Sequence, residues 1–354
     1  MQEGIGMDFQ DILALASARR VDELVPTPKG VAYARYRVPD YPYAGGGNVC
    51  LYAICDQEQV LFVDCGPLGM TDRTWFSKVI DQCAESADQA RLFLTHLHCD
   101  HAGEAAWFAS QGIGRAINGA SARFASMDAQ ECERAFGSAR YDLPFGVAEY
   151  CAMQAGLWES LGQADTVEDW DLLTVGDMRF ETMPLPGHAV GQNGLISKDK
   201  TLLFSGDCLC QNPSVFAWEL DRHDVAAAME SWSGLLAYPL EWVATSHYGF
   251  FEGEEEIQSL IKDQIAGVDS KGKQVLQALR DMRGYRTASG FVLEMKGEAE
   301  IIDASSRAGH LNALRLCQSL AYLEFLYDYE KVHRSFDDDG CAVYEPARFT
   351  SFFA

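Results

Sequence analysis

The stretch RLFLTHLHCDH, residues 91–101, carries most of the information about the fold of this chain. Its apolar beginning, RLFLT, is typical of a strand buried on both faces. Four side chains that can bind a metal ion follow within six residues: His96, His98, Asp100 and His101. A loop at a strand end can point alternate side chains to opposite sides of a cleft, so His96 and His98 can reach one ion while Asp100 and His101 reach a second. Imidazole and carboxylate ligands together suit zinc, iron or manganese.

The alternative interpretation of this stretch is a polar loop with solvated histidines. The whole chain has only 8 histidines, and three of them fall here. A chance grouping of that kind is improbable, so the sequence favours a metal site.

Four more elements with turn-forming neighbours accompany this loop. Upstream, Leu61-Phe-Val-Asp-Cys-Gly66 is an apolar run that ends in Asp64; downstream come Pro186-Gly187-His188, Ser205-Gly206-Asp207 and Ser246-His247. In this order, with the pattern His-x-His-x-Asp-His, the elements resemble the metallo-β-lactamase superfamily over about residues 30–250. The resemblance implies an α/β fold, a four-layer αβ/βα sandwich with metals at one edge.

The resemblance also implies a role for each matching residue. His96, His98 and His188 would hold the first ion, Asp100, His101 and His247 the second, and Asp207 would bridge the two. The ions would be two divalent metals, zinc by default and iron or manganese as alternatives. A hydroxide between them would be the nucleophile, Asp100 would take and return a proton, and Asp64 would orient the ligand histidines.

The substrate is less defined by the sequence. Asp207 stands where one penicillin-cleaving branch carries a thiol, and its carboxylate resembles the glyoxalase II, lactonase and nuclease-like branches. We expect hydrolysis of a small ester-like bond, a thioester or lactone. The rivals are a phosphodiesterase or ribonuclease, a redox relative with a di-iron site, and a non-catalytic binding protein. A formal net charge of −24 repels polyanions, so we expect a small-molecule substrate and no nucleic acid.

Residues 121–161 exceed what a minimal scaffold needs, and they predict a helical insert rich in aromatic side chains. Such an insert can form a lid over an apolar acyl group, with Phe145 and Trp158 as substrate contacts, or it can be an extra helical layer with an ordinary core. Cys210 and Tyr248, next to ligands, are further candidates for the pocket wall. We expect Cys208, beside Asp207, to be a packed thiol.

The composition changes after the last strand of the matched region, so we divide the chain into a catalytic domain, 1–252, and a C-terminal module, 253–354. Helices expected at 254–265, 271–283 and 307–329, followed by a hairpin that turns at Asp339–Gly340, resemble a winged-helix-like tail. Asp337, Asp338 and Asp339 at the wing tip would repel phosphate. We therefore expect a packing or homodimerisation element, or part of the pocket wall.

The remaining features concern the compartment. The 11 cysteines are scattered and odd in number, which favours reduced thiols over a disulfide framework. No membrane span and no signal peptide are recognisable. We expect a cytoplasmic protein that does not bind a membrane.

Overall fold

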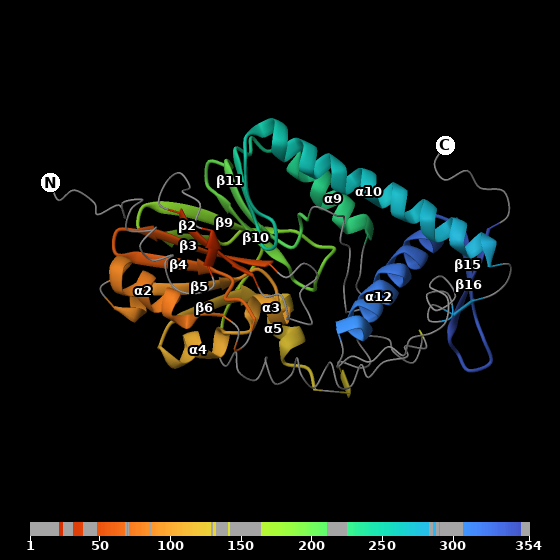
Figure 1. The fold of residues 1–354 in the computed structure, drawn as a ribbon, viewed down its shortest axis with the longest axis horizontal. Coiled ribbons are helices and arrows are strands. Elements are labelled where there is room, and N and C mark those ends of the chain that lie inside the picture. The colour runs from red at the N-terminus through yellow and green to blue at the C-terminus, as the bar shows by residue number, and fades with distance from the viewer. Residues whose placement is uncertain are drawn as a thin grey trace.

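The structure is a computed structural model of the 354-residue chain. It describes residues 21–23, 31–37, 48–67, 69, 71–84, 86–128, 130–131, 141, 164–210, 225–282, 286–287, 290 and 307–347. These residues form two large sheets, a small third sheet and the helices that cover them (Figure 1).

The first sheet contains seven strands in sequence order. They are β1 (Val21–Glu23), β2 (Val31–Arg37), β3 (Asn48–Asp56), β4 (Gln59–Val63), β5 (Ala90–Leu94), β6 (Gly114–Asn118) and β7 (Asp165–Val167). The pairs from β1 to β4 are antiparallel and those from β4 to β7 are parallel. Parallel strands need crossovers, which the helices of this half supply: α2 (Arg73–Cys83), α3 (Cys99–Ala102), α4 (Ala105–Ser110) and α5 (Gly119–Ala125).

The second sheet has six strands in the order β13-β12-β11-β10-β9-β8. They are β8 (Leu172–Val175), β9 (Met178–Pro184), β10 (Asn193–Ser197), β11 (Leu202–Gly206), β12 (Trp242–Thr245) and β13 (Gly249–Glu252). The sequence of residues 172–183 predicts a hairpin that turns at Gly176–Asp177, and this hairpin is present between β8 and β9. The one parallel pair is β11 with β12, and α9 (Val225–Leu235) lies between these two strands in the chain.

The strands carry uninterrupted runs of apolar residues because both faces of each large sheet are buried. In β3, Cys50, Tyr52 and Ile54 face the second sheet and belong to a core that also contains Phe180 and Phe204 of that sheet. The alternate residues Val49, Leu51 and Ala53 face outward and join a core with the helices. Helices α2, α4 and α5 contact the first sheet, and α9 and α10 (Glu254–Asp281) lie on the side of the second (Figure 1). The expected αβ/βα sandwich is therefore confirmed.

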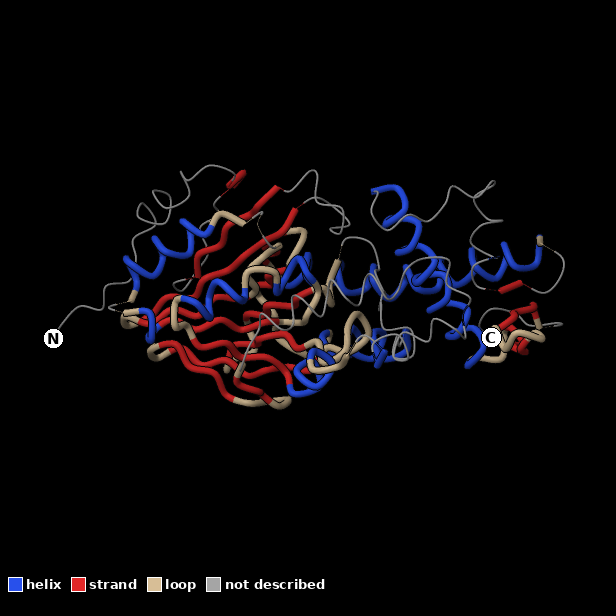
Figure 2. Tube along the Cα trace, turned by 90° about the horizontal axis from the view of Figure 1, so that it is seen from below, coloured by secondary structure: helices blue, strands red, loops and turns tan. Residues whose placement is uncertain are grey.

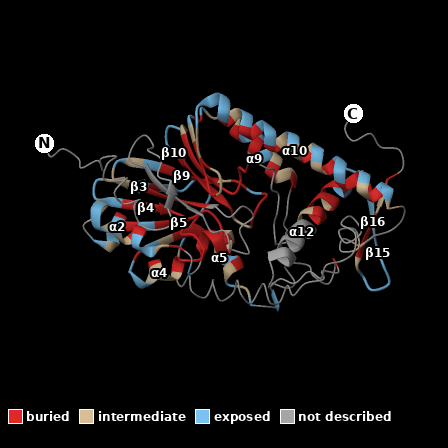
Figure 3. Ribbon diagram, in the orientation of Figure 1, coloured by how far each residue is buried: buried red, intermediate tan, exposed pale blue. Residues whose placement is uncertain are grey.

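The C-terminal part differs from the expectation in one respect. Two helices were expected at 254–265 and 271–283, but α10 is a single helix of 28 residues. Gly267 and Gly272 lie inside this helix, although glycine costs about 1 kcal/mol in a helix interior. A stripe of buried side chains along α10, including Leu260, Val268 and Val275, stabilises the continuous helix (Figure 3).

Beyond α10, helix α12 (Arg307–Asp328) is followed by the predicted hairpin, β15 (Val332–Phe336) and β16 (Ala342–Pro346), which pairs with β14 (Arg286–Thr287). Seen from below, this small sheet lies at the far end of α10 from the sandwich (Figure 2). One hydrophobic core nevertheless continues from the helices of the sandwich into α10 and α12, through Trp232, Ile261 and Leu323. No helix among the described residues has the length and apolar character that a membrane crossing requires.

At the N-terminus, the sequence pattern over residues 10–25 predicts a helix, and this prediction is wrong where it can be compared. Val21–Glu23 is a strand, paired with Arg35 and Tyr36 of β2. The other residues of that range lie outside the described part of the chain. The strand shows that pairing with a sheet edge overrides local helical propensity here.

Candidate metal centre

Four strands end at the same edge of the sandwich, and the predicted metal ligands follow their ends. His96 and His98 come after β5, and the one-turn helix α3 then presents Asp100 and His101. His188, Asp207 and His247 follow β9, β11 and β12. Seven side chains that are up to 151 positions apart in the chain are thus brought to one place by the strand directions alone.

Two glycines allow the ligand turns to form. Gly187 has φ 125° and lies against α9, where a Cβ would come within 2.8 Å of the backbone of Ala228. Gly206 has φ 53°, and a Cβ at this position would come within 3.0 Å of the Thr95 side chain. Any side chain at Gly187 would push the helix away from the loop that carries His188, which explains why glycine precedes this histidine.

The ligand atoms form three overlapping groups in which all atoms lie within 4.8 Å of one another. These groups are His96, His98 and His188; His96, His101 and Asp207; and Asp100, His101 and His247. Asp207 connects the outer groups, because its Oδ2 lies 3.3 Å from His188 Nε2 and 3.2 Å from His247 Nε2. Asp207 Oδ1 lies 3.6 Å from His101 Nε2. Such a cluster can hold more than one metal ion.

The hydrogen bonding of the cluster tests whether its residues suit a cation. His96 Nε2, His101 Nε2 and Asp207 Oδ1 are buried and have no hydrogen-bond partner in the described part of the chain. Buried polar atoms are normally satisfied, and leaving each unsatisfied costs about 1–3 kcal/mol. A divalent ion would satisfy these lone pairs at once, so the residues fit a metal centre.

The pKa values divide the histidines into two sets. Burial, together with the neighbouring imidazoles, holds the pKa values of His96 and His98 well below the usual range, so both are neutral and able to bind a metal. Burial acts in the same direction on His247, but the Asp207 and Asp100 carboxylates outweigh it and raise its pKa to about 9.

The pKa of His101 is likewise raised well above its usual value against the effect of burial, because the carboxylates of Asp207, Asp100 and Asp64 surround it. Burial would raise the pKa of Asp207, but His247, His101 and His188 lower it well below its usual value. The acidic side of the cluster therefore attracts positive charge, which a proton supplies in the metal-free protein.

Asp64 orients two of the ligands from outside the cluster. Its Oδ2 accepts from His101 Nδ1 at 2.8 Å, and its Oδ1 accepts from the Thr95 backbone N–H at 2.8 Å. Thr95 Oγ1 donates to Asp64 Oδ2 at 2.9 Å and lies 3.0 Å from His96 Nδ1. With Nδ1–H donating in both imidazoles, the Nε2 lone pairs of His96 and His101 face the cluster.

The loop after Asp207 is held by two helices. Trp232 of α9 donates to the Cys208 carbonyl at 2.6 Å, and the amide of Gln264 in α10 donates to the Cys210 carbonyl. Cys208 is buried in the core, and burial raises the pKa of its thiol to about 12, so it is a packed thiol as expected. Gln264 was not predicted, because a buried glutamine on a helix belongs to no recognisable sequence motif.

Tyr248 and Cys210, the two candidates for the pocket wall, lie close to each other. Burial, then the Cys210 thiol and the Asp207 carboxylate, raise the pKa of the half-buried Tyr248 to about 12. Its phenol therefore stays protonated and can donate a hydrogen bond at neutral pH. Cys210 is buried, with its Sγ 3.5 Å from the Asp207 carbonyl oxygen.

Glu104 is a further polar residue of this region that sequence reasoning missed. It is fully buried three residues after His101, and its Oε1 accepts from the Gly69 N–H at 2.6 Å. Its Oε2 accepts from Arg73 Nε at 2.7 Å. The pair formed by Glu104 and Arg73 anchors the first turn of α2 to the turn between α3 and α4. A carboxylate within one helical turn of a ligand histidine was the available signal.

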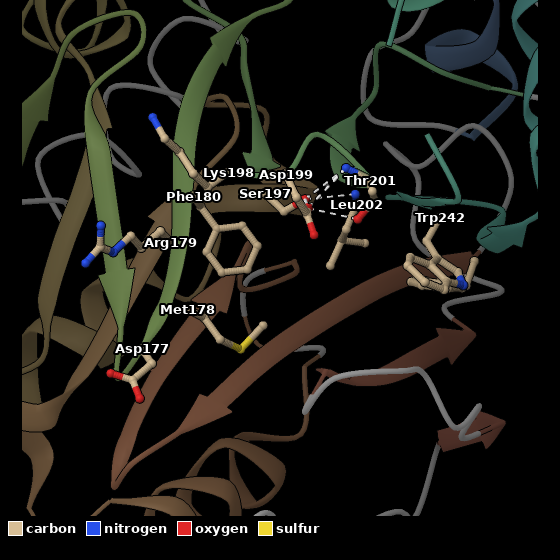
Figure 4. Close-up of a pocket in the computed structure, with 11 residues that line it drawn as sticks. Asp177, Met178, Arg179, Phe180, Ser197, Lys198, Asp199, Thr201, Leu202 and Trp242 are labelled. Atoms are coloured by element: carbon tan, nitrogen blue, oxygen red, sulfur yellow. Dashed lines mark hydrogen bonds between the residues drawn. The ribbon is translucent and has the colours of Figure 1, made fainter. Parts of the chain in front are cut away.

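The predicted insert is only partly described. Phe124 and Tyr141 are buried and belong to the main hydrophobic core. Phe145 and Trp158, the proposed substrate contacts, lie outside the described residues. A separate cavity of about 380 Å³ is lined by Met178, Leu202 and Trp242 (Figure 4). These residues begin β9, β11 and β12, so the cavity lies at the opposite end of these strands from the ligands.

Comparison with known proteins agrees with this geometry. The family model described as "Metallo-beta-lactamase superfamily" matches residues 43–247, more than half of the chain. The acyl-coenzyme A thioesterase MBLAC2 of Homo sapiens is 27% identical over 172 residues, which cover 47% of this chain and 60% of that protein. The match thus spans three fifths of the curated relative's length.

Two solved structures share the fold over nearly the whole chain. A beta-lactamase domain protein from Burkholderia ambifaria is 22% identical with a TM-score of 0.68, covering 92% of this chain and 94% of that one. A metallo-beta-lactamase family protein from Thermus thermophilus is 19% identical with a TM-score of 0.68, covering 90% of this chain and 98% of that one.

Proposed function

Because the chain belongs to the metallo-beta-lactamase superfamily, we propose that it is a dinuclear metal-dependent hydrolase that cleaves a small acyl thioester. The observation that carries the proposal is the cluster of ligand atoms, which form three overlapping groups within 4.8 Å. A single ion needs only one such group. Here the middle group shares His96 with the first group and His101 with the third, an arrangement that suits two neighbouring ions.

The first ion would be held by His96, His98 and His188, and the second by Asp100, His101 and His247. Asp207 would bridge them, because one oxygen of its carboxylate lies within 3.3 Å of both His188 Nε2 and His247 Nε2. The donor set, nitrogen with carboxylate oxygen, favours zinc, with iron or manganese as alternatives.

The bound ions would supply Lewis acidity at the substrate carbonyl and lower the pKa of the attacking water. The chain supplies the proton transfer and the positioning. Asp100 lies with its Oδ2 3.6 Å from His247 Nε2, and its carboxylate can accept a proton from the water and return it to the leaving group. The neutral phenol of Tyr248 can donate a hydrogen bond to the oxyanion that develops on the substrate.

Two observations favour a thioester over a phosphodiester. The matched relative is an acyl-coenzyme A thioesterase, 27% identical over 172 residues. The formal net charge of −24 counts against the phosphodiester backbone of a nucleic acid in particular, because affinity for nucleic acids depends largely on the neutralisation of many phosphates. A lactone presents the same carbonyl chemistry, and we expect it to be a poorer substrate of the same site.

The proposal is tested by a comparison of hydrolysis rates on zinc-loaded protein. The substrates are an acyl-coenzyme A, an N-acylhomoserine lactone, a β-lactam and bis-p-nitrophenyl phosphate. We expect the highest kcat/KM for the thioester, and a loss of at least about 100-fold in Asp100→Asn because the proton acceptor is removed. Asp338→Asn, an exposed carboxylate of the C-terminal hairpin, is the matched control.

Each outcome bears on a separate part of the proposal. A higher kcat/KM for the phosphodiester than for the thioester would overturn the proposed substrate class but not the proposal that the protein is a hydrolase. If protein with both ions bound turns over none of these substrates, the proposal that it is a hydrolase is overturned.

A further inference from the structure

Two cysteines meet on the outer face of the first sheet, at the opposite end of its strands from the metal ligands. In β3 the residues Val49, Leu51 and Ala53 face outward, and the alternation of side chains continues this face to Cys55. Helix α2 covers the face with Phe76 and Val79. The helical repeat extends this apolar stripe to Cys83, the last residue of α2.

Both patterns therefore place the two thiols opposite each other, and the contact is present. The thiols of Cys55 and Cys83 are joined by a side-chain hydrogen bond. Both residues are half-buried, unlike the fully buried Cys50, Cys65, Cys99, Cys208 and Cys210. All eight cysteines that the structure describes are in the reduced state.

The contact changes the acidity of the two thiols in opposite directions. The hydrogen bond with Cys55 lowers the pKa of Cys83 against the effect of burial. The same hydrogen bond, with burial, raises the pKa of Cys55 well above its usual value. Cys83 is thus the thiol that ionises first, with its partner already in contact, and thiolate character governs reactivity toward oxidants.

We propose that Cys55 and Cys83 are a redox modification site, at which a peroxide oxidises the pair to a reversible intramolecular disulfide. The Cys83 thiolate attacks one peroxide oxygen and releases hydroxide, which gives a sulfenic acid at Cys83. The Cys55 sulfur then attacks that sulfur, its proton leaves with the hydroxyl group as water, and the S–S bond forms. The two thiols lose two electrons, which reduce hydrogen peroxide to two molecules of water.

The disulfide would fasten the C-terminal end of α2 to β3. The other end of α2 is already fixed, since Arg73 pairs with the buried Glu104. Oxidation would therefore hold the helix at both ends, and we expect the oxidised protein to unfold at a higher temperature than the reduced protein.

The test is intact-mass and peptide analysis of the full chain after treatment with a few equivalents of hydrogen peroxide. We expect a loss of about 2 Da, two hydrogens, reversed by dithiothreitol. Cys83 lies in the tryptic peptide 79–91, whereas Cys55 shares the peptide 38–73 with Cys50 and Cys65. Cys55→Ser and Cys83→Ser should each abolish the cross-link between these peptides, and Cys341→Ser, at another half-buried cysteine, should retain it.

Circular dichroism of each variant shows whether it is folded, so a missing cross-link in a folded variant is informative. The proposal is overturned if peroxide produces sulfinic acid at Cys83 without a cross-link, if a cross-link persists in Cys55→Ser, or if both thiols resist oxidation in the folded wild type.

Discussion

Replacing Asp64 with Asn tests how the chain prepares its ligands for metal. Asp64 adopts φ 60°, a left-handed conformation that asparagine tolerates as well as aspartate, so the backbone is not strained by the change. The amide keeps one oxygen, which can still accept from the Thr95 N–H. Its NH₂ group then faces His101 Nδ1, where two donors would meet.

The mismatch is relieved if the proton of His101 moves to Nε2. That tautomer accepts at Nδ1, but its Nε2 no longer offers a lone pair to the second ion. Loss of such an orienting partner typically weakens metal binding 10–100-fold, about 1.4–2.7 kcal/mol at 1.36 kcal/mol per factor of ten. We expect the affinity for the second ion to fall, and the affinity for the first ion to fall less, since Asp64 acts on His96 only through Thr95.

The assay is a zinc titration of chelator-treated protein in competition with a chromophoric chelator, for the wild type and Asp64→Asn. Asp338→Asn controls for the loss of a charge elsewhere. Two sites of unchanged affinity in Asp64→Asn, in protein that folds, would refute the tautomer argument.

Three further predictions concern neighbouring groups. Tyr248→Phe should lower kcat by about 10-fold or more with unchanged metal content, since an oxyanion donor is removed; an unchanged kcat would exclude this role. Gln264→Met leaves the Cys210 carbonyl without its donor and should lower the free energy of unfolding by about 1–3 kcal/mol, whereas the exposed Gln274→Met should not. In chelator-treated protein, His247 has its pKa raised to about 9, so its stabilising contribution is complete below about pH 6.5 and is lost as the pH rises through 9. The thermal midpoint should fall as the pH rises from about 6.5 through 9, and it should fall less in Asp207→Asn. Equal falls in both proteins would contradict the pairing of His247 with Asp207.

The members of the cluster were predictable from the sequence because four of them, His96, His98, Asp100 and His101, follow an apolar strand, and because the resemblance to the metallo-β-lactamase superfamily pointed to His188, Asp207 and His247. A strand end is set by local patterning, and four strand ends at one edge then fix the cluster. The hairpin turns at Gly176–Asp177 and Asp339–Gly340 were predictable because their residues are typical of tight turns.

What the sequence did not predict depends on contacts between distant elements. Gln264 donates to the Cys210 carbonyl across 54 positions of the chain, because α10 packs against the loop that follows Asp207, and no local pattern of the sequence indicates that contact. Glu104 is paired with Arg73, 31 positions away, through a loop whose path has no local signature. The edge strand β13, which pairs with β12, is short and carries two consecutive phenylalanines, so it has no clear alternation.

The central claim is a pair of ions bridged by Asp207, and elemental analysis tests it most directly. Protein purified without chelator, and then equilibrated with zinc and desalted, should hold two equivalents per chain. Asp207→Asn should hold about one, because the shared carboxylate charge beside His188 and His247 is removed. A wild type that reproducibly holds one equivalent, with Asp207→Asn equal to it, would contradict the dinuclear centre.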